Sequence, residues 1–168
     1  MASIQLAGII RESIVDGPGI RFVVFVQGCP HKCPGCHNAE THDPAGGYTG
    51  DTSRLFDEFI KNPMLKGMTF SGGEPFEQAH PLIELAKQVH ETGKNIITFT
   101  GYTLEYLLAH ANDENGYLDL LKQTDILIDG PFILEKKSML LHFRGSSNQR
   151  ALDVAASLEQ GKAVEIEI

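Results

Sequence analysis

The three cysteines of this 168-residue chain, Cys29, Cys33 and Cys36, are the residues whose type and spacing most clearly indicate chemistry. They lie within eight residues in the spacing Cys-x3-Cys-x2-Cys, in a loop that also holds two prolines, a glycine, a lysine and a histidine. Such a polar, bent loop is a poor core segment, so three inert buried thiols are disfavoured. A closed metal cage of thiolates needs four ligands. Three cysteines therefore predict a site that is completed by a histidine or a site with one open position.

Three metal-binding interpretations compete for this loop. Residues 33–37 read Cys-Pro-Gly-Cys-His, the haem attachment pattern, but residues 1–10 lack the charged and long apolar regions of an export signal. A zinc ion would take His31, His37 or His42 as its fourth ligand, although structural zinc usually binds two separate pairs of ligands. A [4Fe–4S] cluster held by three thiolates would leave one iron open to a substrate or cofactor.

A second polar segment reads Ser-Gly-Gly-Glu-Pro at positions 71–75. Paired glycines such as Gly72 and Gly73 let backbone carbonyls approach a cation closely, and the carboxylate of Glu74 supplies the opposite charge. The same residues also suit an ordinary turn from a strand into a helix, with an acid in the first helical turn. The segment alone leaves both interpretations open.

Hydrophobic patterning predicts strands and helices that alternate along the chain, which indicates an α/β fold with a parallel sheet and right-handed crossovers. Apolar runs predict an edge strand at 3–10, buried strands at 20–26, 67–70, 95–99 and 125–128, and a terminal strand at 163–168. Helical periodicity and caps predict helices from Thr52 or Ser53 to the residue before Asn62, at 78–92, 103–110 and 117–123, and a short one that is stopped by Gly161.

The polar motifs follow the predicted strands directly, and parallel sheets bind ligands at the carboxyl ends of their strands. The cysteine loop, Gly72 to Glu74, Thr100 to Tyr102 and Asp129 each follow one strand, so we expect all four on one rim. About five or six strands are too few to close a barrel. We therefore predict one domain, residues 1–168, with the fold of an open partial (β/α) barrel and a mostly parallel sheet.

Composition narrows the classes of function. The formal charge of −8 argues against a general nucleic-acid binder, and no window approaches 18 consecutive apolar residues, so no membrane span is expected. Three cysteines without an export signal fit the cytoplasm, where thiols stay available to metals.

The cysteine spacing resembles that of radical S-adenosylmethionine (SAM) enzymes. Within that superfamily, Val-Asp-Gly-Pro-Gly-Ile-Arg at 15–21 and Gln-Gly-Cys-Pro at 27–30 resemble the glycyl-radical activating enzymes. Most of the superfamily has an aromatic residue where this chain has Gly35. Glycine there, and the polar segment 143–150, are similar to the activating proteins of anaerobic ribonucleotide reductase.

The resemblance implies a [4Fe–4S] cluster on Cys29, Cys33 and Cys36, with SAM on the open iron. No catalytic side chain is expected beyond the cluster and SAM, and no histidine is needed as a general base. Glu74 is expected to hold the SAM ammonium rather than the fold, Asp129 to bond a ribose hydroxyl or a nearby cation, and Arg144 to pair with the SAM carboxylate or with a partner protein. The full set of residues expected at the cofactors is Gly35, His37, Gly72, Gly73, Glu74, Thr100, Asp129 and Arg144.

The function that follows from the resemblance is the generation of a glycyl radical on the catalytic subunit of anaerobic ribonucleotide reductase, with electrons from a flavodoxin- or ferredoxin-type donor. The alternatives are an activating enzyme for another glycyl radical enzyme such as pyruvate formate-lyase, a small-molecule radical SAM enzyme such as 7-carboxy-7-deazaguanine synthase, and a non-catalytic zinc module. Neither nucleic acid nor membrane is expected as a partner.

Overall fold

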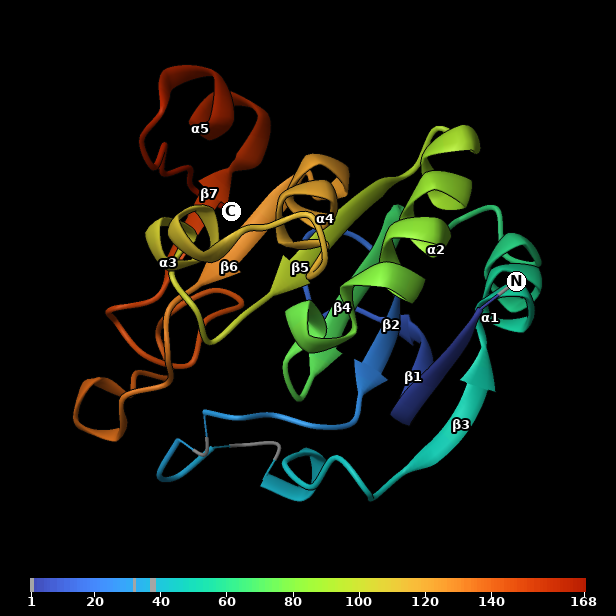
Figure 1. Ribbon diagram of the computed structural model, residues 1–168, viewed down its shortest axis with the longest axis horizontal. Helices are drawn as coiled ribbons and strands as arrows, with labels where there is room; N and C mark the ends of the chain where they lie inside the picture. The colour runs from blue at the N-terminus through green and yellow to red at the C-terminus, as the bar shows by residue number, and fades with distance from the viewer. Residues whose placement is uncertain (1, 32, 37–38) are drawn as a thin grey trace.

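The computed structural model describes residues 2–31, 33–36 and 39–168. Within these residues seven strands form one open sheet in the order β3-β1-β2-β4-β5-β6-β7 (Figure 1). The strands are β1 (Ser3–Ser13), β2 (Arg21–Val26), β3 (Tyr48–Asp51), β4 (Gly67–Gly72), β5 (Asn95–Phe99), β6 (Ile126–Asp129) and β7 (Arg150–Asp153).

The four central strands, β2, β4, β5 and β6, pair in parallel, and the flanking strands β1, β3 and β7 pair antiparallel. The buried strands that the sequence predicts are therefore found, and the α/β class with an open, mostly parallel sheet is confirmed. Strand β2 is buried at five of its six positions, which explains its apolar run without alternation.

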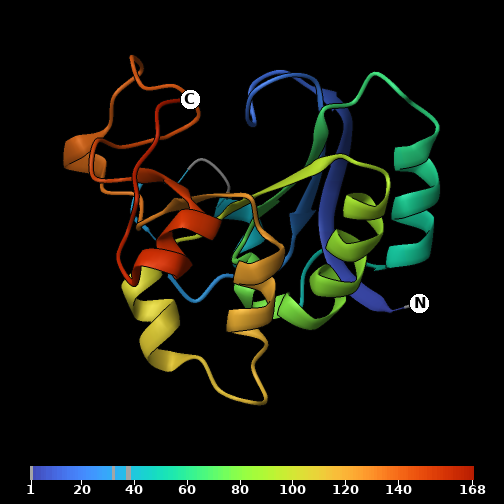
Figure 2. The same ribbon diagram turned by 90° about the horizontal axis from the view of Figure 1, so that it is seen from above.

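Five helices connect or follow the strands. They are α1 (Thr52–Ile60), α2 (Ala79–Glu91), α3 (Leu104–His110), α4 (Tyr117–Gln123) and α5 (Val154–Gln160), with short 3-10 segments η1 (Ala39–Thr41), η2 (Pro75–Gln78) and η3 (Leu134–Lys136). Figures 1 and 2 show α1 to α4 on one face of the sheet. Right-handed crossovers between parallel strands that are added in one direction require this arrangement.

The two faces of the sheet have different contents. The helix side holds the larger core, with Phe22, Phe70 and Ile96 fully buried against the helices. The other face, which we call the inner face, carries a smaller cluster around Ile97 and Ile128. Segments 14–20 and 131–149 lie on this side of the sheet (Figure 2).

Several elements differ from the sequence prediction. The sequence patterns do not predict strands β3 and β7, and β3 pairs with β1, so β1 is not an edge strand. Residues 163–168 form no strand and touch β7 through one isolated bridge, Leu152 to Glu165. Asp51, not Thr52 or Ser53, caps α1 by accepting a hydrogen bond from the Ser53 amide. None of the described helices is both long and apolar enough to cross a membrane.

Candidate functional site

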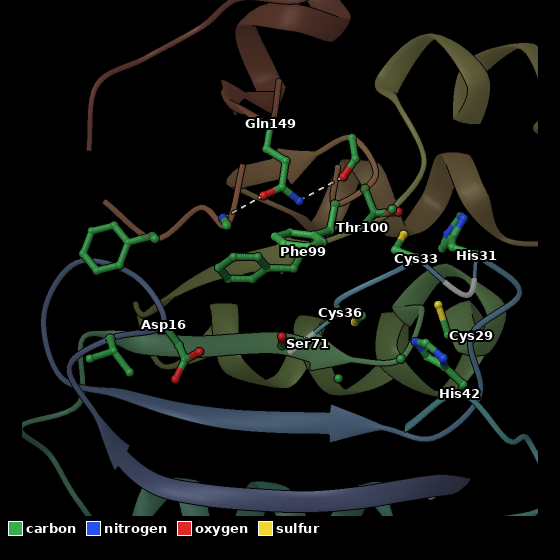
Figure 3. A pocket seen from close by; sticks show the side chains of 18 residues that line it. Asp16, Cys29, His31, Cys33, Cys36, His42, Ser71, Phe99, Thr100 and Gln149 are labelled. Atoms are coloured by element: carbon green, nitrogen blue, oxygen red, sulfur yellow. Dashed lines mark hydrogen bonds between the residues drawn. The ribbon is translucent and has the colours of Figure 1, made fainter. Parts of the chain in front are cut away.

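One cavity of about 230 Å³ lies where the carboxyl ends of the parallel strands meet (Figure 3). All four predicted rim segments contribute to its lining: Cys29, Cys33 and Cys36 after β2, Gly72 and Gly73 at the end of β4, Thr100 and Gly101 after β5, and Gly130 after β6. The prediction of a common rim is thus confirmed, although Gly130 rather than Asp129 lines the cavity.

The cavity is elongated, with the cysteines toward one end. In Figure 3, Cys29 and His42 lie at one end and Asp16 at the other, with Ser71 and Phe99 between them. Thr69 on β4 is the register partner of Ile97 on β5, so both face inward; Ser71 lies two residues beyond Thr69, and Phe99 two residues beyond Ile97. Because side chains two apart on a strand share a face, the inner face of the sheet forms the wall of the cavity.

Backbone hydrogen bonds hold the start of the cysteine loop, residues 27–38, against the segment that follows it. The Gly28 amide donates to the Thr41 carbonyl at 2.6 Å, and the Cys29 amide donates to the His42 carbonyl at 3.1 Å. The buried Gln27 side chain donates to the carbonyls of Glu40 and Asp43 at 3.0 and 2.7 Å. Cys29 is therefore fixed by its own backbone hydrogen bond and by the polar contacts of the two residues before it.

The second and third cysteines are joined by a tight turn. The Cys36 amide donates to the Cys33 carbonyl at 3.1 Å, and Gly35 has a φ of +75°. Proline followed by a residue with positive φ is the signature of a type II turn, which explains glycine at this position. A Cβ atom on Gly35 would lie 2.8 Å from the Leu134 side chain, and Gly35 does not line the cavity. His37, the neighbouring predicted cofactor residue, lies outside the described residues.

The paired glycines allow β4 to end against the cysteine loop. A Cβ atom on Gly72 would lie 2.6 Å from the backbone of Val26, and one on Gly73 would lie 2.3 Å from the Gly28 carbonyl. The Gly73 and Glu74 amides donate to the carbonyls of Val26 and Gly28, each at 2.8 Å. Glycine is required at both positions because only hydrogen fits between these backbones.

Glu74 is fully buried and is engaged by the protein itself. Its carboxylate accepts hydrogen bonds from the Thr100 hydroxyl and the Gly101 amide at 2.8 Å and caps η2 through the Phe76 amide at 3.1 Å. The ring nitrogen Nε2 of His31 lies 2.6 Å from the same carboxylate. The expectation that Glu74 holds SAM rather than the fold is therefore incomplete, because its carboxylate also ties the cysteine loop to the loop after β5. Its contact with SAM stays a prediction.

Aromatic packing extends this link outward from His31. The His31 and Tyr102 rings meet edge to face with centroids 4.4 Å apart, and the Tyr102 hydroxyl donates to Glu77. Burial, followed by the hydrogen bond to Glu77, raises the pKa of the Tyr102 phenol, so the ring stays neutral and keeps donating. His31 is held by packing as well as by Glu74.

Asp129 is buried at the end of β6 and is paired with Arg150 of β7. The two side chains form a bidentate ion pair with N···O distances of 3.0 and 2.6 Å, and Asp129 also accepts from the Leu104 amide at the start of α3. The hydrogen bonds to Asp129, then those to Glu105, raise the pKa of the Arg150 guanidinium. Arg144, by contrast, lies outside the cavity, in a neighbouring cleft. Contacts of Asp129 and Arg144 with SAM stay predictions.

The three thiols fit the thiolate ligands of an iron–sulfur cluster. All three line one cavity with intermediate exposure. Among the described residues, no three His, Cys, Asp or Glu side chains are grouped closely enough to ligate one ion. Thiolates of a cluster bind different irons and therefore do not converge on one point. The Gly72–Gly73 backbone, which lines the same cavity, offers the close approach that a bound cofactor needs.

Comparison with known proteins agrees with this geometry. Residues 15–152 match the family described as "4Fe-4S single cluster domain". Proteins named anaerobic ribonucleoside-triphosphate reductase-activating protein match from Vibrio cholerae (35% identity, 81% of this chain and 89% of the relative), Escherichia coli K12 (33%, 81% and 90%) and bacteriophage T4 (34%, 81% and 85%). The chain belongs to the family of anaerobic ribonucleoside-triphosphate reductase-activating proteins.

A solved structure that resembles this activating-protein family member is QueE from Escherichia coli. The two share 16% sequence identity, with a TM-score of 0.47 over 60% of this chain and 54% of QueE.

Phe143 and Gln149 line the cavity of this family member and are absent from the predicted set of cofactor residues, although both lie in the segment 143–150 that carries the resemblance. Gln149 accepts hydrogen bonds from the amides of Gly145 and Ser146 and donates to the Gly130 carbonyl, which holds segment 131–149 beside the cavity. Phe143 lines the cavity with a φ of +61°, a costly conformation for a non-glycine residue. No pattern of spacing or periodicity marks these residues, because their positions depend on contacts between distant segments.

Proposed function

We propose that this protein uses a [4Fe–4S] cluster and SAM to generate a glycyl radical on the catalytic subunit of anaerobic ribonucleotide reductase. The observation that carries the proposal is that three thiols and the paired glycines face one cavity in a member of this family. The names of the relatives support the choice of reductase as the partner. The residues involved come from one sheet and its connections, so we treat residues 1–168 as one radical SAM domain.

Cys29, Cys33 and Cys36 would hold the cluster, each through its thiolate. When bound, the cluster and SAM supply the one-electron chemistry that yields the radical. The chain's own contribution is to fix these ligands. Gln27 anchors the start of the cysteine loop, and the hydrogen-bonded turn that contains Gly35 fixes the spacing of Cys33 and Cys36.

Gly72, Gly73 and Thr100 line the cavity, and we assign them to SAM together with Glu74. The buried carboxylate of Glu74 places negative charge behind the glycine backbone, where it would favour the SAM ammonium. Glu74 also orients Thr100 and Gly101 through hydrogen bonds. His37, Gly35, Asp129 and Arg144 remain predicted contacts of the cofactors.

We infer that the remaining participants are proteins. A flavodoxin- or ferredoxin-type donor would supply the electron, and a reducing cytoplasm would keep the thiols available. The cavity is connected to an open cleft rather than enclosed, which suits a loop of a protein substrate better than a metabolite that must be shielded. The reductase would present the glycine to this opening.

The test is anaerobic reconstitution of the protein with iron and sulfide, followed by reduction in the presence of SAM and a candidate partner. We expect a protein-bound glycyl doublet in the electron paramagnetic resonance spectrum with the reductase catalytic subunit. The controls omit SAM, omit the reductase, or replace the reductase with pyruvate formate-lyase. Iron and sulfide per chain are measured on the same sample.

The outcomes separate the candidate functions. A doublet on pyruvate formate-lyase alone would keep the chemistry and change the partner. Rapid turnover of a pterin without any protein partner would indicate a small-molecule radical SAM enzyme. Zinc in place of iron and sulfide would contradict the proposal altogether.

A further inference from the structure

A second hollow opens directly beside the cysteine cavity. It is a cleft of about 590 Å³ between the turn after β1 and segment 137–145. Val15, Phe143 and Gly145 line both the cavity and the cleft. Asp16, the neighbour of Val15, lies at the end of the cavity away from Cys29 (Figure 3). The cleft and the cavity are therefore continuous at the end that is farthest from Cys29.

The cleft is bordered by four of the five most exposed large apolar side chains of the described residues. Leu140 is 92% exposed and Met139 83%, and Ile14 and Val15 across the cleft are 73% and 71% exposed. Isolated exposed apolar residues are ordinary, but a contiguous group beside a site marks a surface that another molecule covers.

The segment that carries Met139 and Leu140 is held in shape by the protein itself. An antiparallel bridge between Lys137 and Ser146 closes its base, and the Ser147 amide donates to the Lys136 carbonyl at 2.8 Å. Gln149 accepts from the Gly145 and Ser146 amides. A preformed loop presents its apolar tip without the entropic cost of ordering it on binding.

The charge of the cleft is opposite to that of the whole chain. The chain carries a formal charge of −8, yet the described residues that line the cleft include Lys137 and Arg144 and no Asp or Glu. Among the described residues neither cation forms an ion pair. An apolar surface with unpaired cations at its border is complementary to an apolar segment that is flanked by carboxylates.

We propose that this cleft docks an apolar loop of the protein substrate, with carboxylates beside it, and guides that loop past Val15 and Phe143 into the cavity. The inference rests on the proposed function, because it assumes that the molecule acted on is a protein. Its support is the continuity of cleft and cavity, the exposed apolar residues and the reversed charge. It assigns Ile14, Met139 and Lys137 to partner recognition, in a region separate from the cysteine loop.

The test compares substitutions in the cleft with matched substitutions elsewhere. The double variant Ile14→Ser, Met139→Ser is paired with the control Ile60→Ser, Met64→Ser, which changes the same residue types at exposed positions on α1 and just after it. Lys137→Glu is paired with Lys87→Glu on α2. Affinity of each iron-loaded protein for the reductase catalytic subunit is measured anaerobically by calorimetry at low and high salt.

We expect the double cleft variant to raise the Kd for the reductase about tenfold or more, because burial of apolar side chains is the main favourable term in protein–protein association. Lys137→Glu should raise Kd about fivefold at low salt and less at high salt, since exposed charges are screened. Both controls should remain within about twofold of the parent.

Other results would overturn the proposal in recognisable ways. If the parent gives a glycyl doublet with the reductase and both cleft variants bind it as the parent does, the cleft inference fails alone. If the parent gives no doublet, the proposed function fails, and the cleft inference with it. A cleft variant that loses SAM affinity instead would assign the cleft to the cofactor. A parent dimer that the double variant abolishes in sedimentation would assign it to a second copy of the chain.

Discussion

Each end of the parallel strands buries charged side chains completely, Arg21 at the amino end and Glu74 and Asp129 at the carboxyl end, and the two ends hold these charges in different ways. At the amino end, Arg21 donates to the Thr69 hydroxyl at 2.7 Å and to the Met68 carbonyl at 2.9 Å, with longer contacts to the carbonyls of Pro18 and Asn95. At the carboxyl end, Glu74 accepts from the loops that surround the cysteine cavity.

The difference lies in what each charge connects. The partners of Arg21 belong to the central strands, their first residues and the turn before β2, so this charge fastens the sheet to itself. Burial lowers the pKa of Arg21 to about 10, and the field of Asp125 opposes part of that shift, so the side chain remains charged at neutral pH. Glu74 connects separate loops at the rim. Comparing the two ends indicates that the fold is fastened at one end and the site is positioned at the other.

The largest expected effect is on the cluster. Changing Cys29, Cys33 or Cys36 to alanine should abolish a stable [4Fe–4S] site, while the unfolding free energy of the metal-free protein changes by about 0.5 kcal/mol or less, because these residues lie partly exposed in a loop. Iron and sulfide analysis and anaerobic denaturation measure the two quantities. His42→Ala is the control and should keep its iron. A full cluster in any cysteine variant would contradict the ligand assignment.

At the opposite end, Arg21→Met should damage the fold rather than the chemistry. It removes a buried donor group from the Thr69 hydroxyl and the Met68 carbonyl, so we expect the unfolding free energy to fall by about 3 kcal/mol. Denaturant titration of the metal-free protein measures this loss.

The matched control is Arg11→Met, since Arg11 is 63% exposed and pairs only at the surface with Glu58. It should cost about 0.5 kcal/mol or less. Equal losses in the two variants would remove the contrast between the ends of the strands. The Arg21→Met protein that remains folded should still bind iron.

The sequence predicts the parallel strands and the rim because strands that are buried on both faces, such as β2 and its neighbours, consist of runs of apolar residues. Short edge strands contain no such apolar run. Strand β7 reads Arg-Ala-Leu-Asp, and its place in the sheet depends on pairing with β6. The alternation at 163–168 is typical of a strand, yet these residues make one bridge only.

The candidate site likewise contains residues that the sequence predicts and contacts that only the structure shows. The spacing identifies Cys29, Cys33 and Cys36 as candidate ligands, since three cysteines within eight residues have few functions other than binding a metal or a cluster. Polar contacts between distant segments cannot be predicted from pattern, and His31 and Glu74 are 43 residues apart. Periodicity therefore finds the elements, and the structure is needed to show which side chains they bring together.

Glu74→Gln tests whether one residue serves both the fold and the site. The variant keeps the shape of the side chain but loses a buried charge that four groups contact, so we expect the unfolding free energy to fall by about 1 to 2 kcal/mol. SAM binding should weaken by about 1 to 3 kcal/mol, the range for a charged hydrogen bond. Denaturation and calorimetry with SAM measure the two effects separately.

Glu77→Gln, in the 3-10 segment that Glu74 caps, is the control, because Glu77 is exposed and contacts the hydroxyls of Tyr102 and Tyr117 rather than residues that line the cavity. It should leave SAM affinity unchanged. Lower stability with unaltered SAM affinity in Glu74→Gln would confine Glu74 to a positioning role, and unchanged stability would show that its buried contacts contribute nothing.

The smallest expected effect comes from the exposed part of the carboxyl-end network, where Arg150 also pairs with Glu105 at 2.6 Å. The hydrogen bond from Arg150 holds the pKa of the Glu105 carboxyl below its usual 4.5. Because the folded-state pKa lies below the unfolded-state pKa, this contribution is present above pH 4.5 and is lost as the pH falls through the folded-state pKa. The Glu105 side chain is 61% exposed, so the pair contributes only about 0.3 kcal/mol to the unfolding free energy.

Glu105→Gln should therefore lower the unfolding free energy slightly at pH 7, and the difference from the parent should vanish in acid. In an Arg150→Gln background the same change should have no effect, because the partner that depresses the pKa is gone; the double-mutant cycle isolates the pair. Arg150→Gln alone should cost more, since it leaves Asp129 buried beside Leu104 without its cation. A larger loss for Glu105→Gln than for Arg150→Gln would mean that the exposed contact, not the buried one, fastens β7 to the rim.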